Sequence, residues 1–209
     1  MTLLRIDSSI QGPNSASTAL ADRVFAEFRA AQPDAGVVTR HLAQQPLPSD
    51  AWQNAIAAAH TPEDRHSDAD RAALALAAEI AGELRGAGKA ILALPLYNWG
   101  VSQHVKTWID LAIIGAPQGE ALLEGTPTVL VTTRGGAYGP GTPKEGWDHN
   151  LDYLRRILVD VWGADLTVIE REFTLVGVNP ALDRFSEQAA QMKRDAEEAA
   201  VKAGRALAA

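Results

Sequence analysis

The feature that most constrains the fold is a regular alternation of short apolar segments with longer segments of helical periodicity. The run Ala90–Leu94 is almost wholly apolar and lies between Gly88 and Pro95, which is typical of a central parallel strand buried on both faces. Four other segments read as strands: Thr2–Asp7, Gly36–Leu42, Thr128–Thr132 and Asp165–Ile169. Because parallel neighbours need crossover connections, the alternation predicts one parallel sheet with helices on both faces.

Apolar residues at helical spacing separate these strands. Helices are predicted from Ser15, over Trp52–Ala59, through Ala73–Leu84, after Gly100, over Trp147–Trp162 and after Pro180. Within Trp147–Trp162 the inward positions are predicted to be Leu151, Leu154, Leu158 and Val161. About five strands in 209 residues favour the smaller of the two common doubly wound orders. The predicted fold class is α/β: a flavodoxin-like three-layer sandwich with a five-stranded parallel sheet, forming a single domain over residues 1–209.

Composition narrows the functional classes. The net charge of −7 argues against a nucleic-acid partner, because phosphate contacts need clustered Lys and Arg. The chain has no cysteine, which excludes disulfides, thiolate metal sites and cysteine nucleophiles. The five histidines lack metal-ligand spacing, so no metal site is predicted. No signal peptide and no apolar stretch of roughly 18 residues is found, which predicts a soluble, cytoplasmic protein without membrane partners.

Polar loops follow the first, third and fourth strands, whose carboxyl ends share one edge of the sheet. The first loop, Ser8–Ser17, contains four serines directly before a helix. Backbone amides at a helix N-terminus together with hydroxyls bind phosphate without needing Lys or Arg. Serine is also a preferred helix cap, so capping remains the alternative for this loop.

The second loop, Pro95–Gly100, places Tyr97 and Trp99 on either side of Asn98. These rings suit a flat heteroaromatic ligand, or alternatively cover the end of the core.

The third loop, Thr133–Gly141, contains the pair Gly135-Gly136. Paired glycines allow a close backbone approach to a ligand, or alternatively mark a flexible surface turn. Arg134 reads by default as a solvated charge; over a ligand it would offset negative charge on a reduced ring. One loop suits a phosphate, one a planar ring and one the polar rim of that ring, which together predict a mononucleotide such as FMN.

These segments follow one another along the chain in the same order as in a known protein family. The matching pieces are Ser9 with Ser15-Ala16-Ser17, then Pro95-Leu96-Tyr97-Asn98-Trp99, then Lys106–Asp110, and then Thr133-Arg134-Gly135-Gly136. In this order they resemble the FMN-dependent NADH-azoreductase family of flavodoxin-like NAD(P)H:quinone oxidoreductases, over nearly the whole chain. The resemblance implies a tightly bound FMN and an enzyme that uses NADH or NADPH as a transient donor to reduce quinones or azo compounds in a ping-pong cycle. It also implies a homodimer.

The resemblance assigns roles residue by residue. The residues expected to bind the FMN phosphate are Ser9, Ser15, Ala16 and Ser17. Those expected to contact the flavin ring are Leu96, Tyr97, Asn98 and Trp99. Those expected to contact the pyrimidine side of the ring are Thr133, Arg134, Gly135 and Gly136. No catalytic side chain is predicted, because the cofactor carries the chemistry. Two alternatives stay open: a flavodoxin-type electron carrier, and a flavin-free binding domain that keeps the fold.

One departure from the family pattern concerns Leu111–Pro127. The family usually has a longer, aromatic-containing segment there that leans over the flavin pocket. The shorter segment predicts either a more open pocket or one covered by the loop Tyr138–Trp147.

Overall fold

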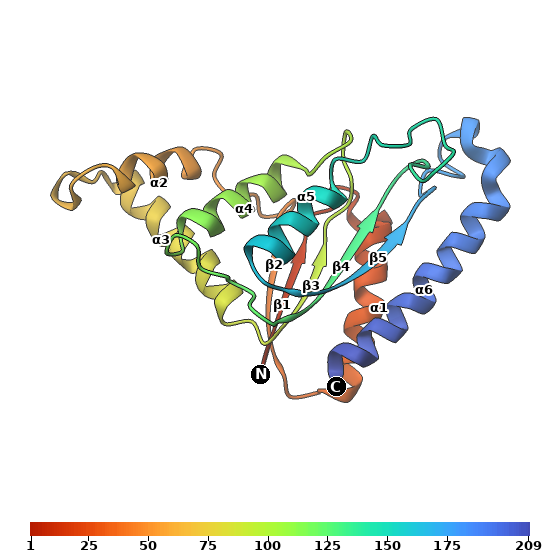
Figure 1. Ribbon diagram of the computed structural model, residues 1–209, viewed down its shortest axis with the longest axis horizontal. Helices are drawn as coiled ribbons and strands as arrows, with labels where there is room; N and C mark the ends of the chain where they lie inside the picture. The colour runs from red at the N-terminus through yellow and green to blue at the C-terminus, as the bar shows by residue number, and fades with distance from the viewer.

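Five parallel strands form one sheet in the computed structural model, which describes residues 1–209 (Figure 1). The strands are β1 (Thr2–Asp7), β2 (Gly36–His41), β3 (Lys89–Ala93), β4 (Pro127–Thr133) and β5 (Asp165–Arg171). Their order across the sheet is β2-β1-β3-β4-β5, with every neighbouring pair parallel. The predicted flavodoxin-like α/β sandwich is confirmed.

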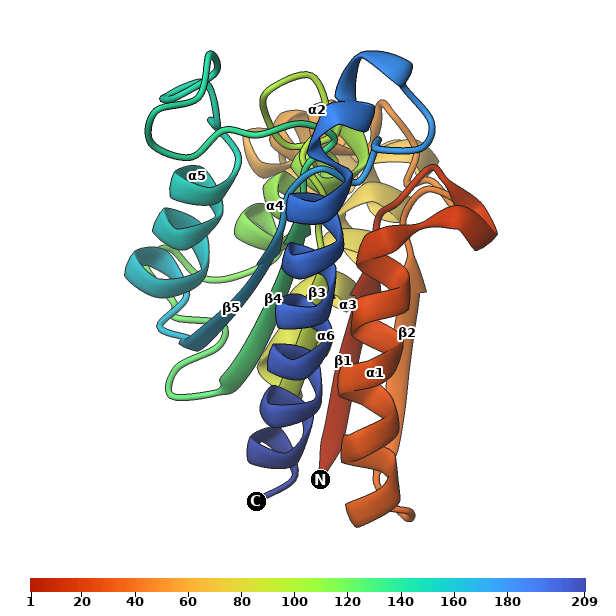
Figure 2. The same ribbon diagram turned by 90° about the vertical axis from the view of Figure 1, so that its right-hand side faces the viewer.

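Helices cover both faces of this sheet. They are α1 (Ala16–Ala31), α2 (Ala51–Ala59), α3 (Asp68–Arg85), α4 (Gln103–Ile114), α5 (Leu151–Arg155) and α6 (Ser186–Ala208). Short 3-10 turns lie at Gly12–Asn14, Glu63–Arg65 and Pro180–Phe185. Figures 1 and 2 show α1 and α6 side by side on one face, with α2 to α5 on the other. The sandwich therefore has three layers.

The central strand β3 faces two separate hydrophobic cores. Ile91 and Ala93 pack with α1 and α6, whereas Ala90 and Leu92 pack with α3 and α4. All four side chains are fully buried. Burying a side chain of leucine or isoleucine size contributes about 1.5–3 kcal/mol, so a strand apolar on both faces is stable only between two helical layers.

Gly204 lets α6 approach α1 closely. A Cβ atom built at Gly204 would lie 2.5 Å from the Val24 carbonyl oxygen of α1, whereas one at Gly82 of α3 would meet nothing within 4 Å. We expect Gly204→Ala to lower the free energy of unfolding by about 1–3 kcal/mol through overpacking. Gly82→Ala is expected to leave it unchanged or raise it by up to about 1 kcal/mol, because alanine favours helices. Urea denaturation of both variants checks this; a stabilised Gly204→Ala protein would contradict the close crossing.

The helix predicted over Trp147–Trp162 differs from the structure at both ends. It begins at Leu151, because the amide of His149 donates to the Trp99 carbonyl (2.9 Å) instead of entering a helix. After Arg155 the chain forms a π-helical segment, Arg156–Val161, in which Trp162 N–H donates to Ile157 O, five residues back. The extra residue per turn rotates the following positions, so Val161, predicted inward, is exposed.

The short segment between α4 and β4 lies at the amino edge of the sheet. Leu123 and Gly125 donate backbone hydrogen bonds to Trp162 and Gly163, just before β5 begins. Figure 1 shows this segment below the strands, at the opposite end from the loops that follow β1, β3 and β4. Within one chain, residues 115–126 therefore do not cover the predicted site.

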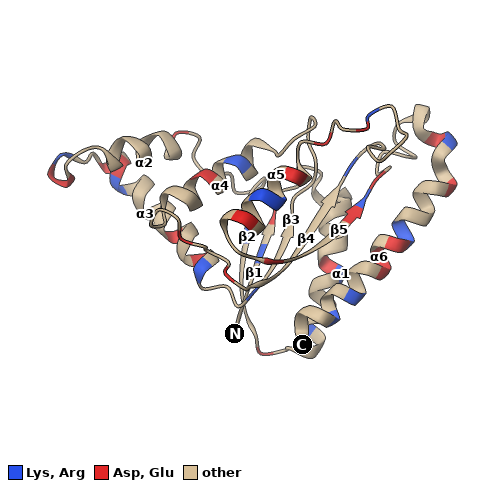
Figure 3. Ribbon diagram, in the orientation of Figure 1, with Lys and Arg blue, Asp and Glu red and all other residues tan.

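Charges of both signs are mixed on the helix surfaces, as Figure 3 shows along α6. No helix combines the length and the apolar character that crossing a membrane requires.

Candidate functional site

The three predicted loops meet at the carboxyl edge of the sheet. The Ser8 amide donates to the Ala93 carbonyl (3.1 Å), which joins the first loop to the end of β3, two residues before the second loop. The Leu96 amide donates to the Thr133 carbonyl (3.0 Å), which joins the second to the third. Both contacts follow from the strand order, since β1, β3 and β4 are neighbours. Figure 2 shows the three loops at the same, upper end of the molecule.

The first turn of α1 holds two buried serines. Ser15 caps the helix, because its Oγ accepts from the Thr18 amide (3.1 Å). The capping interpretation of Ser15 is thus confirmed. Ser17 is also buried, and its hydroxyl contacts only the Ser15 hydroxyl, at 3.2 Å. A helix N-terminus leaves its first amides without intrahelical partners, and here Ala16 and Ser17 have no other acceptor in the chain.

Tyr97 reaches from the second loop into the first. Its hydroxyl accepts from the Ile10 amide (3.0 Å) and lies 3.3 Å from the Ser9 hydroxyl. Ser9 Oγ also accepts from the Gln11 amide (3.2 Å). Ser9 and Tyr97 therefore tie the two loops together. Their predicted contacts with a phosphate and a ring stay predictions.

Asn98 and Trp99 adopt a backbone conformation that side chains rarely take. Their φ angles are +47° and +67°, and Tyr97 and Gly100 exchange two backbone hydrogen bonds of 3.0 Å around them. This is a two-residue reverse turn with both central residues left-handed, which usually requires asparagine or glycine. A non-glycine residue in this region costs about 1–3 kcal/mol, and such strain gathers at binding sites. The turn projects the Trp99 indole, which is 44% exposed, beyond the sheet edge.

Arg134 is buried and bound by carboxylates. It is only 5% exposed, so its interpretation as a solvated charge is wrong. Its Nε donates to Asp148, its Nη1 donates to Glu170 (2.7 Å), and Glu172 lies 3.8 Å away. Burial alone would lower the pKa of Arg134, but the hydrogen bonds and charges of Glu170 and Asp148 outweigh it and raise the pKa. The cation is thus permanent and locks the third loop to β5.

The third loop is braced along its backbone as well. The amides of Phe173, Thr174 and Leu175 donate to the carbonyls of Gly136, Arg134 and Gly135 respectively, at 3.1–3.2 Å. The interpretation of this loop as a flexible turn is therefore not supported.

Asp148 connects Arg134 to the start of α5 through hydrogen bonds. Its second carboxylate oxygen accepts from the amides of Asn150 (2.7 Å) and Leu151 (3.1 Å). Asn150 is fully buried, donates to Thr132 Oγ1 (3.1 Å) and leaves its own amide oxygen without a partner. The segment 147–150 is therefore fixed to the carboxyl edge of the sheet at several points.

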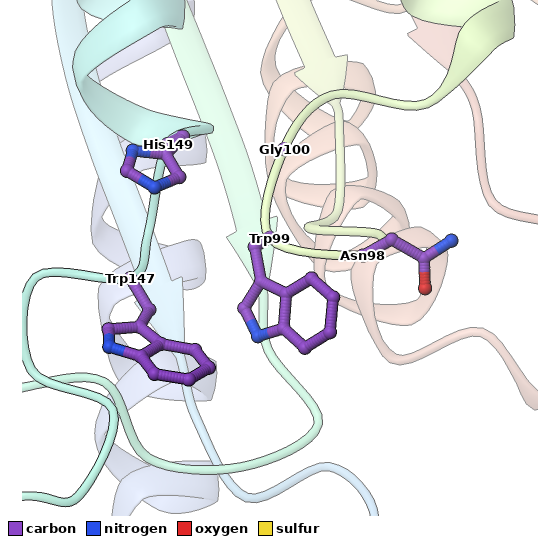
Figure 4. Close-up of a pocket in the computed structure, with 5 residues that line it drawn as sticks. All are labelled: Asn98, Trp99, Gly100, Trp147 and His149. Carbon is purple, nitrogen blue, oxygen red and sulfur yellow. The ribbon is translucent and has the colours of Figure 1, made fainter.

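Figure 4 shows a depression beside the Asn98–Trp99 turn. It has a volume of about 440 Å³ and is lined by Asn98, Trp99, Gly100, Trp147 and His149. The rings of Trp99 and Trp147 meet edge to face, with centroids 6.0 Å apart and an interplanar angle of 68°. Trp147 is 50% exposed. Two half-exposed indoles thus stand together at the predicted site.

All three loops present backbone N–H donors without a partner at this edge of the sheet. Several backbone amides have no acceptor within the chain: Ser9, Ala16, Ser17, Asn98, Trp99, Gly135 and Gly136. All seven belong to the residues predicted to bind the cofactor. An edge with free N–H donors and no basic side chain among them suits an anionic ligand with polar ring atoms.

The sequence interpretation gave no site role to Asp148, His149 and Asn150, and at the site it named Trp147 only as the end of the loop Tyr138–Trp147. The predicted helix over Trp147–Trp162 includes all four residues, although Gly146 with φ +77° turns the chain before them. An available signal was Asp148, three residues before the helix start at Leu151, because an aspartate near a helix N-terminus is typical of capping. The placement of Trp147 against Trp99 depends on long-range contacts and had no local signal.

Comparisons with known proteins agree with this arrangement. A family model described as a flavodoxin-like fold matches residues 1–200. The chain is 37% identical over 190 residues to an FMN-dependent NADH:quinone oxidoreductase of Frankia alni, covering 88% of this chain and 90% of the relative.

Solved structures share the fold. The azoreductase AzrA superposes with a TM-score of 0.79 at 19% identity, over 99% of this chain and 100% of the other. An FMN-dependent NADH-azoreductase of Bacillus anthracis in complex with FMN gives a TM-score of 0.73 at 16% identity, over 97% and 99% of the two chains. At such identities the likeness establishes the fold alone.

Proposed function

This chain belongs to the flavodoxin-like family that includes FMN-dependent NADH:quinone oxidoreductases, and on that premise we propose that it is an FMN-dependent oxidoreductase. It uses NADH or NADPH to reduce quinones, azo compounds or both. The observation that carries the proposal is the set of unpartnered amides that three loops bring to one edge of the sheet. Neither a carrier nor a flavin-free domain is favoured by any feature of that edge.

The residues present fit FMN. Two free amides and two buried hydroxyls at the start of α1 (Ala16, Ser17 and Ser15) would hold the phosphate. Charge-assisted bonds from such donors replace a basic side chain. The amides of Asn98, Trp99, Gly135 and Gly136 would bond the polar edge of the ring.

When bound, FMN supplies hydride transfer from the nicotinamide donor to the acceptor. The chain's own contribution is positional and electrostatic. Amides fixed in advance around the ring stabilise negative charge without reorganisation. Arg134 holds Gly135 and Gly136 in place through its carboxylate partners. The donor leaves before the acceptor binds, in the ping-pong order predicted from the sequence.

Anaerobic mixing tests this function. Bound flavin is expected to bleach when NADH or NADPH is added and to regain its colour when a quinone follows. The same two steps with an azo dye test the second acceptor class. A flavin that stays oxidised under excess NADH and NADPH would leave an electron carrier as the better description.

Two further parts of the proposal rest on the family resemblance and on the sequence respectively. We propose a homodimer, which sedimentation equilibrium would detect as twice the chain mass of 22.2 kDa. A mass of 22.2 kDa at all concentrations would refute it. A cytoplasmic location stays a prediction, to be checked by cell fractionation.

A further inference from the structure

One side of the depression beside the Asn98–Trp99 turn is formed by Trp147, a residue to which the family resemblance assigns no role. Trp147 comes from the loop after β4 and contacts Trp99 from the loop after β3. Figure 4 shows both indoles on one side of the turn, with the Asn98 side chain pointing away from them. The turn therefore carries two free backbone amides, at Asn98 and Trp99, and one of the two indoles that lie beside it.

This aromatic pair is held in place rather than loosely exposed. His149 N–H donates to the Trp99 carbonyl (2.9 Å), two residues from Trp147. Asp148, the residue between them, is bound by the buried Arg134. The turn that carries Trp99 is itself strained, with φ at +67°. The strained turn and the buried ion pair hold the two indoles in a half-exposed position. Backbone strain and exposed apolar surface of this kind are typical of a ligand-binding site.

The shape of the surface indicates the class of ligand. An indole is a flat two-ring system, so a flat two-ring molecule covers its face whereas a one-ring molecule covers about half. Aromatic pairs prefer stacked or edge-to-face geometry, and two indoles inclined at 68° offer a ligand one of each. The depression is open to solvent and has a volume of about 440 Å³, which leaves room for a flat two-ring molecule against the indoles.

We propose that Trp147, together with Trp99, forms the acceptor subsite and makes the enzyme select flat two-ring quinones over one-ring quinones. This inference rests on the proposed function and deepens it. Trp147 contacts the acceptor, while Arg134 and Asp148 act through it as positioning residues. The loop after β4 thus provides the cover that the short segment 115–126, at the opposite edge, does not provide.

Trp147→Ala tests the assignment, because a half-exposed loop residue can be removed without opening the core. We expect the KM for a two-ring naphthoquinone to rise roughly ten-fold with kcat nearly unchanged, since lost aromatic contacts of about 1.4 kcal/mol correspond to that factor. The KM for a one-ring benzoquinone should change much less. Trp147→Phe should restore most of the affinity, and the KM for NADH and the FMN content should stay as in the wild type.

A binding experiment gives a readout apart from turnover. 2-Naphthol is flat, has two rings and accepts no hydride, and its binding to the FMN-loaded protein can be followed by ligand-observed NMR. Trp147→Ala is expected to weaken this binding roughly ten-fold.

Unchanged naphthoquinone KM and 2-naphthol affinity in Trp147→Ala would overturn the inference. A change in FMN content or in the KM for NADH instead of the quinone would overturn it too, by assigning Trp147 to the cofactor or donor. A wild-type protein that binds no FMN, or whose flavin NADH does not reduce, would refute the proposed function itself. The two failures are therefore distinguishable.

Discussion

Arg134→Met is expected to lower the free energy of unfolding by about 3–5 kcal/mol, a large share of the roughly 5–15 kcal/mol that stabilises a typical domain. The substitution removes a buried cation and leaves Asp148 and Glu172 largely buried without their partner, while Glu170 is partly exposed. An uncompensated buried carboxylate is costly because it is withdrawn from water. The substitution also removes one of the several contacts that fix the segment carrying Trp147.

Urea denaturation in the flavin-free state measures this loss without a contribution from bound cofactor. Arg156→Met is the matched control: Arg156 pairs with Asp160 on the surface, with side chains 74% and 53% exposed. Such a pair contributes at most about 1 kcal/mol. Equal losses in the two variants would show that burial adds nothing to the Arg134 interactions.

The double variant Ser15→Ala/Ser17→Ala is expected to weaken FMN binding about a hundred-fold. Hydrogen bonds to a charged group contribute about 1.5–3 kcal/mol each, and 1.4 kcal/mol corresponds to a factor of ten. The two hydroxyls lie 3.2 Å apart and would share one phosphate, so the lower end of their summed effect is expected. Titration of the flavin-free protein with FMN, followed by flavin fluorescence, gives the dissociation constant.

Two controls separate phosphate binding from helix capping. Ser67→Ala removes the cap of α3, where Ser67 accepts from the Asp70 amide far from the site, and should cost about 1 kcal/mol of stability without changing FMN affinity. Riboflavin lacks the phosphate, so the wild type and the double variant should bind it equally. An unchanged FMN constant in the double variant would place the phosphate elsewhere.

Most of the fold could be predicted because its signals are local. The strand β3 is an apolar run between a glycine and a proline, and the amphipathic stripe of α3 ends in Gly86. The errors lie where tertiary contacts override the local pattern. The π-helical segment after α5 reverses the burial of Val161, and no periodicity in the sequence announces it.

The candidate site likewise has features that could be predicted from the sequence and features that could not. Its three loops could be located because parallel topology brings the ends of β1, β3 and β4 together. The role of Arg134 could not, since Glu170 lies 36 residues away in sequence and Asp148 lies in an apparent helix. Tyr97 likewise bonds Ser9 and Ile10 across 87–88 residues, a contact that no local pattern encodes.

The visible absorption spectrum of the purified protein tests the central claim most directly. If the amides of the three loops hold FMN, the protein is yellow, or takes up one FMN per chain when flavin is added. The spectrum then shows the two bands of oxidised flavin. A colourless protein that leaves added FMN free in solution would contradict the account.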